Sequence, residues 1–149
     1  MRRLKVLTLT DQLVYLGGGA ERVAMEIAMR LDQSRFESVF CASRYWDGLQ
    51  VDSVQEAERR MDEAGVRYLG LGRRSPTDLH RWFPLRGILR RERVDVLHAH
   101  MFGSNAWGTA IGRLARVPAP ARQSMNVRPS TSSTWMPLAR FSARGMRRG

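Results

Sequence analysis

The sequence has little cysteine and little lysine: Cys41 is the only cysteine, and Lys5 is the only lysine among 25 basic residues. A lone cysteine cannot form an internal disulfide, which excludes the small disulfide-stapled protein classes. No apolar run approaches the roughly 20 residues that a membrane-spanning helix needs. Two arginines precede the first apolar stretch, but Lys5 and Asp11 interrupt that stretch, unlike a signal peptide. We therefore expect a cytoplasmic protein.

Acidic residues are outnumbered by basic ones, and the net charge is +11. Such a charge favours anionic partners, namely phosphorylated substrates, acidic lipids or nucleic acid. A nucleic-acid binder is the weakest of these interpretations, because the arginines are spread over several predicted elements and no nucleic-acid motif occurs. We expect no specific binding of nucleic acid.

Apolar, strand-like runs alternate four times with helix-like segments. The predicted strands are residues 4–10, 36–43, 66–71 and 94–101, and the predicted helices are residues 20–31, 54–65, 79–93 and 105–117. This alternation favours an α/β fold, a Rossmann-like open parallel sheet with helices on both faces. In such sheets, ligands bind beyond the carboxyl ends of the strands.

Apolar spacing also predicts which side of each helix faces the core. In the first helix, Val23, Ile27 and Leu31 recur at helical spacing with Ala24 and Ala28 beside them, and this face is expected to be buried, while Glu21 and Arg22 face solvent. The fourth helix carries an equivalent apolar stripe, made of Trp107, Ile111, Leu114 and Val117.

The third helix contains a proline, Pro84, which should kink it or divide it in two. Asp78 stands at its start and is a candidate N-cap. Arginines and aromatic residues share this region. Two interpretations stay open: an ordinary amphipathic crossover helix, or a helix that docks on an anionic membrane surface.

The composition changes after Pro118. Residues 119–149 contain no Asp or Glu and many Pro, Ser and Arg, and their apolar runs are short. Such a segment buries too little apolar area to offset the entropy lost on ordering. We therefore predict a Rossmann-like domain over residues 1–118 and an irregular, disordered basic tail over residues 119–149, with no recognisable fifth strand.

Three glycines, Gly17, Gly18 and Gly19, follow the first predicted strand and run directly into the first helix. The free N–H groups and the dipole of a helix N-terminus attract anions, and glycine lets a phosphate or sugar approach the backbone. The spacing is not the dinucleotide fingerprint, because Arg22 stands where its third glycine would be, and no Walker A lysine follows. The alternative is a flexible turn without a ligand.

Two histidines, His98 and His100, lie on one face of the fourth predicted strand. His98 lies deeper in the strand and is interpreted as a packed histidine. His100 ends the strand at the rim, where it is either a site residue or another packed histidine. No metal site is expected, because only His80 remains as a third imidazole and Asp95 lies at the other end of the strand.

The segments GGGAER, DVLHAH and GSNAWG occur in this order within residues 4–118. Together they resemble the amino-terminal domain of family 4-like glycosyltransferases. The resemblance implies a retaining enzyme of the GT-B fold, in which two Rossmann-like domains face each other across a cleft. It implies transfer of a sugar from a nucleotide-sugar, which is a co-substrate rather than a cofactor. The acceptor would be a lipid-linked or cell-envelope glycan.

The resemblance also assigns residues. Glycines 17–19 match the loop that reaches the donor phosphates and sugar, and His100 matches a histidine near the transferring sugar, the candidate catalytic residue. Asn105 matches the acceptor side. Arg22 is assigned to the acceptor as well, because a cation in the first turn opposes the helix dipole unless it meets an anion. A solvated surface arginine is the alternative.

The family's second domain, which holds most of the nucleotide site, has no counterpart in these 149 residues. We therefore expect the chain alone to be inactive. Two functions stay open: the acceptor-side domain of a glycosyltransferase on the inner face of the membrane, or a non-catalytic, truncated remnant or binding module that needs a separate donor-binding chain.

Overall fold

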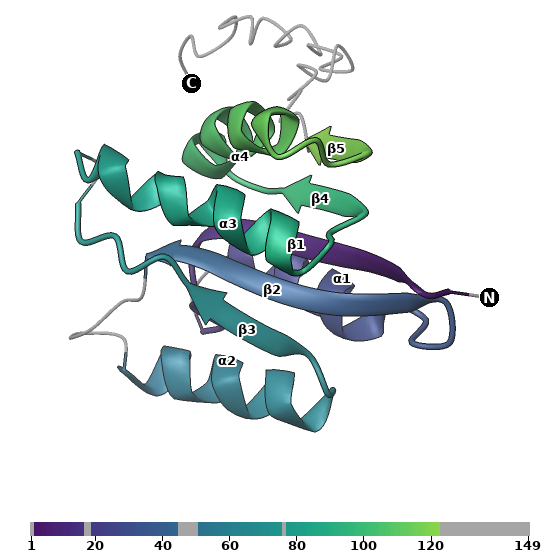
Figure 1. Ribbon diagram of the computed structural model, residues 1–149. Coiled ribbons are helices and arrows are strands. Elements are labelled where there is room, and N and C mark those ends of the chain that lie inside the picture. The colour runs from purple at the N-terminus through teal and green to yellow at the C-terminus, as the bar shows by residue number, and fades with distance from the viewer. Residues whose placement is uncertain (1, 17–18, 45–50, 76, 123–149) are drawn as a thin grey trace, which may run out of the picture.

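A five-stranded parallel sheet lies at the centre of the computed structural model, which describes residues 2–16, 19–44, 51–75 and 77–122 (Figure 1). The elements in chain order are β1 (Leu4–Gln12), α1 (Gly19–Arg30), β2 (Phe36–Arg44), α2 (Val51–Glu63), β3 (Arg67–Gly70), the 3-10 helix η1 (Leu79–Trp82), α3 (Phe83–Arg91), β4 (Val96–Ala99), α4 (Phe102–Leu114) and β5 (Ala119–Arg122). The alternation of strands and helices that the sequence predicts is confirmed.

The strand order is β3-β2-β1-β4-β5, so the chain builds the sheet in two directions from β1. Leu9 of β1 stands beside Cys41 of β2 on one side and beside Ala99 of β4 on the other. The order therefore reverses between β1 and β4. Ligands of open α/β sheets bind at the carboxyl ends of the strands beside such a reversal.

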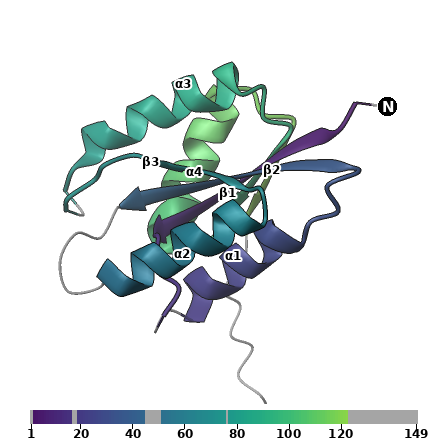
Figure 2. The ribbon, with the colours of Figure 1, turned by 90° about the horizontal axis from the view of Figure 1, so that it is seen from below.

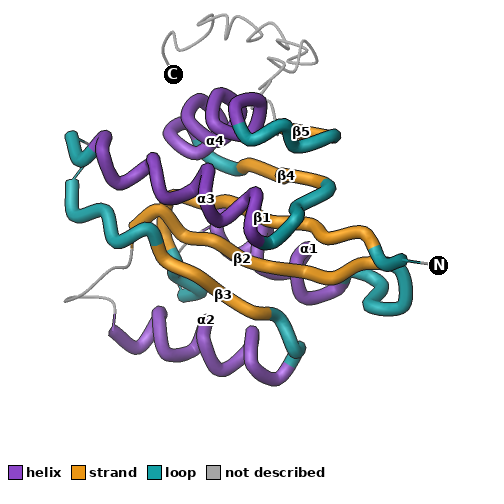
Figure 3. Tube along the Cα trace, viewed as in Figure 1, coloured by secondary structure: helices purple, strands orange, loops and turns teal. Residues whose placement is uncertain are grey.

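Helices cover both faces of the sheet, as predicted. Figure 2 shows α1 and α2 on one face and α3 with α4 on the other, and the strands lie between these two helical layers in Figure 3. Because side chains alternate along a strand, Leu7, Leu9 and Leu97 pack towards α3 and α4, whereas Phe40 and Ala42 pack towards α1 and α2. Each face therefore has its own apolar core.

The predicted buried face of α1 is confirmed for its two alanines and wrong for its larger apolar residues. Val23 is 50% exposed and Ile27 is also exposed, whereas Ala24 and Ala28 are buried against the sheet. Glu21, which was expected in solvent, is buried. Two alanines on one side let the helix axis approach the strands closely, and this close contact outweighs the larger apolar residues on the next stripe.

The predicted stripe of α4 is confirmed at Ile111 and Val117, which are buried, and wrong at Trp107 and Leu114, which are exposed. Leu114 is 67% exposed, while the face towards the sheet is lined by Ser104, Gly108, Ile111 and Gly112. A Cβ at Gly108 would lie 2.7 Å from Cδ2 of the buried Leu9. Small residues thus set how closely α4 approaches β1 and β4.

The third predicted helix is divided, as Pro84 suggested. The 3-10 turn η1 ends at Trp82, and α3 follows with Pro84 in its first turn, where no intrahelical N–H is required. Asp78 does not cap the helix with its side chain. Its carboxylate accepts hydrogen bonds from the backbone N–H groups of Arg74 (2.8 Å) and Ser75 (3.2 Å), and so stabilises the preceding turn.

The structure corrects the predicted end of the sheet. The backbone of residues 119–122 forms β5, which pairs with β4 from Val96↔Ala119 to Ala99↔Arg122. The prolines around this segment suggested a break, but a strand at the edge of a sheet tolerates proline because one side of it needs no ladder bonds. The rest of the predicted tail, residues 123–149, lies outside the described residues.

Charged side chains are linked at the amino edge of the sheet. The Lys5 ammonium lies 2.8 Å from Glu37, and Arg67 lies 2.7 Å from Glu92. The hydrogen bond from Arg67 holds the pKa of Glu92 below its ordinary value. Asp95 accepts the backbone N–H of Lys5 at 2.9 Å, which joins the start of β4 to the start of β1.

Substitution of Gly108 tests the close approach of α4. Both Gly108→Ala and Gly87→Ala gain helix propensity worth about 1 kcal/mol. Gly87 on α3 has open space around its Cβ position, whereas Gly108 faces Leu9. We expect Gly108→Ala to be less stable than Gly87→Ala by about 1–3 kcal/mol in chemical denaturation, because its methyl group overpacks the core. Equal stability of the two variants would contradict this packing.

Candidate functional site

His100 stands directly after β4, at the carboxyl edge of the sheet. Its backbone N–H donates to the carbonyl of Leu9 at 2.8 Å, so it continues the pairing of β4 with β1. Its Nε2 lies 3.2 Å from Nδ1 of His98, two residues earlier on the same face. The structure thus confirms that both imidazoles share one side of the sheet, which is the side covered by α1.

The burial of the two histidines differs from the expectation. His100 is only 2% exposed, whereas His98 is partly exposed. β1 is nine residues long and β4 is four, so the end of β1 continues past Ala99 and flanks His100. Burial lowers the pKa of His98 below its ordinary value of 6.5. His100 is therefore buried and in contact with His98, and is not a solvent-exposed imidazole at the rim.

A strained turn joins His100 to α4. Met101 has φ 71° and ψ 160°, a backbone conformation that is costly for any residue with a side chain. The N–H of Asn105 donates to the carbonyl of Met101 at 2.8 Å, and Asn105 is half-buried in the first turns of α4. Backbone strain of this kind is concentrated at functional sites.

Reasoning from the sequence missed Asp11 and Ser104 at this edge. The Asp11 carboxylate accepts the backbone N–H of Ser104 at 3.0 Å and its hydroxyl at 2.5 Å. The sequence offers one signal for Asp11 as a site residue: it is an acidic residue directly after the first predicted strand. No pattern in the sequence pairs it with a serine 93 residues further along the chain.

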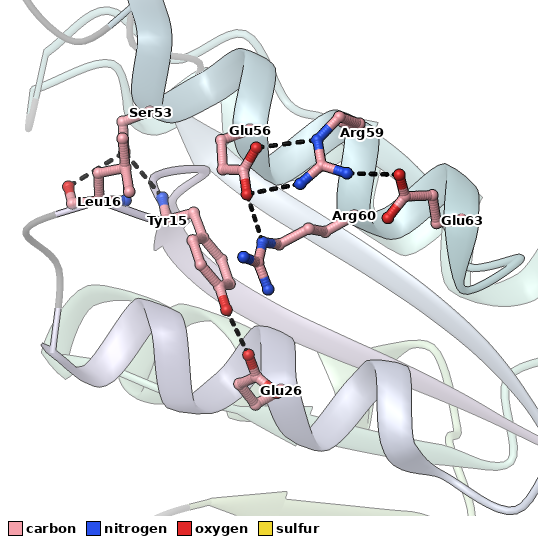
Figure 4. A network of polar contacts seen from close by, with 8 residues as sticks. All are labelled: Tyr15, Leu16, Glu26, Ser53, Glu56, Arg59, Arg60 and Glu63. Carbon is pink, nitrogen blue, oxygen red and sulfur yellow. Dashed lines mark hydrogen bonds and ion pairs between the residues drawn. The ribbon is translucent and has the colours of Figure 1, made fainter.

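The glycine segment is described only at its end. Gly19 is the first residue of α1, whereas Gly17 and Gly18 lie outside the described residues. Figure 4 shows how the chain just before them is anchored to α2. The Ser53 hydroxyl accepts the N–H groups of Tyr15 (2.8 Å) and Leu16 (2.6 Å) and donates to the Leu16 carbonyl (3.0 Å). Ser53 is a second residue that sequence reasoning missed.

Arg22 contacts an aromatic ring. Its guanidinium carbon lies 5.1 Å from the centre of the Tyr15 ring, and that of Arg60 lies 4.2 Å from the same centre. The Tyr15 hydroxyl donates to Glu26 of α1 at 2.5 Å (Figure 4). The cation–π contact accounts for an arginine in the first turn of a helix without any ligand. Acceptor binding by Arg22 stays a prediction.

The topology brings some of the predicted site residues to one place. Because β1 and β4 are parallel neighbours, His100, Asn105 and Gly19 at the start of α1 share the carboxyl edge. Roles in donor or acceptor binding for these residues stay predictions. Within the described part of the chain, no three His, Cys, Asp or Glu side chains are grouped as a metal site requires.

Comparison with known proteins decides the family. Residues 18–148 match the family described as "Glycosyl transferase 4-like domain", which is most of the chain. The chain belongs to this family. None of the curated proteins compared with the chain matches it.

Two solved structures of larger proteins share the fold of this glycosyltransferase 4-like domain. One is a glycosyltransferase from Rickettsia africae ESF-5, with a TM-score of 0.55 and 15% identity over 80% of this chain and 29% of that one. The other is MurG from Acinetobacter baumannii, with a TM-score of 0.55 and 14% identity over 82% of this chain and 36% of that one. The chain thus spans about a third of the length of either protein.

The environment of His98 makes stability depend on pH. Since burial lowers its pKa in the folded state, the unfolded chain binds the proton more tightly, and stability falls as the pH drops through 6.5. We expect an NMR titration midpoint for His98 below 6.5. We also expect His98→Gln to lose less unfolding free energy than the wild type between about pH 7.5 and 5.5. Identical losses in the two proteins would contradict this environment.

Proposed function

We propose that this domain is the acceptor-side half of a glycosyltransferase that moves a sugar from a nucleotide-sugar to a lipid-linked or cell-envelope glycan. Membership of the glycosyltransferase 4-like family supports this proposal. The observation that carries it is the position of His100, next to the reversal of strand order between β1 and β4. Sheets of this class bind ligands there.

In this proposal the N-terminus of α1 attracts the donor phosphates with its dipole and its free N–H groups. Substrate binding exposes the His100 ring, which is 2% exposed in the structure, and the ring then hydrogen-bonds the sugar or stabilises charge near the anomeric carbon. Its contact with His98 couples the tautomers of the two rings, because one of the two facing nitrogens donates and the other accepts. The leaving diphosphate accepts the proton of the acceptor hydroxyl, so no side chain of this domain acts as a base. A second, donor-binding half completes the site.

The second candidate is a binding module without catalysis. The observation that favours it is the burial of His100, which is 2% exposed, because a packed histidine can hold the fold without contacting a sugar. A transfer and hydrolysis assay with a panel of nucleotide-sugars separates the two candidates. Turnover supports an enzyme, whereas binding without turnover supports a module that needs a partner chain.

We expect nucleotide-sugars to perturb the amide resonances of residues 19–22 and 100–105 in an NMR titration of the chain. His100→Gln should weaken this binding by about tenfold, because it removes one hydrogen bond worth about 1.4 kcal/mol. Gln33→Glu, in the loop between α1 and β2, serves as the control and should bind like the wild type. Perturbations confined to the amino edge of the sheet, or full affinity of His100→Gln, would contradict the proposed site.

We further propose that the face formed by η1, α3 and α4 contacts an anionic membrane surface that carries the acceptor. Phe83 is 76% exposed and Phe102 is 85% exposed, and both stand where their helices begin at the carboxyl edge. The three helices contain no Asp or Glu, but they carry five exposed arginines: Arg81, Arg86, Arg90, Arg91 and Arg113. No helix of the described residues is long and apolar enough to span a bilayer, so the proposed contact is peripheral.

Cosedimentation with vesicles tests this surface. We expect binding to vesicles with anionic lipid that weakens at high salt. The double variant Phe83→Ser/Phe102→Ser should bind about tenfold more weakly, because two rings no longer enter the interface. Val23→Ser removes a side chain that is 50% exposed on α1, which covers the opposite face of the sheet, and should change nothing. Equal binding to neutral and anionic vesicles would refute the proposal.

A further inference from the structure

Asp11 occupies the N-terminus of α4. The first N–H groups of a helix have no partner within it, and the residue before α4, Met101, has no side-chain acceptor. Asp11 supplies one from the end of β1: its Oδ1 accepts the backbone N–H of Ser104 at 3.0 Å and the Ser104 hydroxyl at 2.5 Å. A Cβ at Gly103 would lie 3.1 Å from the same oxygen, so a glycine permits this approach.

Asp11 is itself held by the ends of the other strands. Its backbone carbonyl accepts the hydroxyl of Ser43, the next-to-last residue of β2, at 3.2 Å. That hydroxyl accepts from Nη1 of Arg73 at 3.2 Å, and the Arg73 N–H donates to the Ser43 carbonyl at 3.0 Å. Arg73 is buried, its guanidinium lies 4.7 Å from the Trp82 ring, and its charge interacts with that of Asp11. The backbone at Asp11 is therefore held from β2, and Arg73 in the loop after β3 attracts its carboxylate.

The segment that Asp11 holds contains the proposed site residues. The chain from His100 to Asn105 is attached at one end by the bond from the His100 N–H to Leu9, and near the other by Asp11 through Ser104. Between these attachments Met101 keeps its strained backbone. Strain persists only where the surroundings hold it, so release of one attachment lets the turn relax and moves His100 relative to Asn105.

We propose that Asp11 is a positioning residue that holds the turn from His100 to Asn105 in the geometry that binds the substrate. This role deepens the proposed function and rests on it. The carboxylate acts through two attractions that a neutral side chain lacks, to the helix N-terminus and to buried Arg73. It touches no reacting atom and acts only through the turn.

Asp95 provides a matched control at the opposite edge. Its carboxylate also accepts a backbone N–H from a distant strand, that of Lys5, 90 residues away, at 2.9 Å. Asp11→Asn and Asp95→Asn therefore remove the same charge from the same kind of contact. Ser104→Ala is a milder variant, which removes only the hydroxyl bond to Asp11 and keeps the backbone bond.

The experiment records amide and histidine-ring resonances together with nucleotide-sugar affinity. In Asp11→Asn we expect shifted resonances for His98, His100, Met101 and Asn105, and affinity lowered by about tenfold, since small misplacements of site residues have effects of this order or larger. Ser104→Ala should shift the same resonances and lower the nucleotide-sugar affinity as well, but both effects should be smaller than in Asp11→Asn. Asp95→Asn should lower the melting temperature like Asp11→Asn but leave the turn and the affinity unchanged.

The outcomes separate this role from the proposed function. If Asp11→Asn leaves the resonances of the turn unchanged, or if Asp95→Asn shifts them equally, Asp11 is not a positioning residue. If Asp11→Asn does not fold, the same criterion is applied to Ser104→Ala: unchanged resonances of the turn would contradict the role of Asp11. If the wild type binds no nucleotide-sugar, the proposed function fails, and the resonances still decide whether Asp11 holds the turn.

Discussion

The central strand β1 is hydrogen-bonded on both sides, to β2 and to β4, and the other features of the fold follow from this double pairing. Crossovers between parallel strands are right-handed. The connections from β1 to β2 and β3 therefore place α1 and α2 on one face of the sheet, and the connections to β4 and β5 place α3 and α4 on the other. The ends of β1 and β4 become neighbours although about 90 residues separate them. A site at their carboxyl ends is a consequence of this topology.

The sequence predicts the elements well and the faces of the helices poorly. Strand alternation and helix spacing locate four strands and four helices, because burial of an apolar face is a local property of the pattern. Which side of α1 faces the sheet depends instead on how closely the helix approaches it. The small residues Ala24 and Ala28 allow a close approach and are buried, whereas the larger Val23 and Ile27 are exposed. β5 was missed because a four-residue edge strand with a proline carries almost no pattern.

In the candidate site, too, some features follow from neighbouring residues in the sequence, and others depend on contacts between residues far apart in the chain. The position of His100 follows from the end of its strand and can be predicted. Its burial depends on how far β1 extends beside it, and its contact with His98 depends on the rotamers of both rings. The bond from Ser104 to Asp11 joins residues 93 apart, and no single sequence pairs them. Local patterns thus locate a site, while contacts across the fold determine its geometry.

Charge is distributed unevenly over the domain, and this distribution relates the site to its surroundings. At the amino edge, Glu37, Glu92 and Asp95 are paired with Lys5, Arg67 and Arg2, so these acidic groups are neutralised. At the carboxyl edge, Asp11 is directed inward to α4, and the helices η1, α3 and α4 present arginines without acidic neighbours in the same helices. Arg90, Arg91 and Arg113 stand in the last turns of α3 and α4, so the excess positive charge extends along these helices to the amino edge. An anionic ligand or surface that approaches the face of η1, α3 and α4 therefore meets a favourable potential.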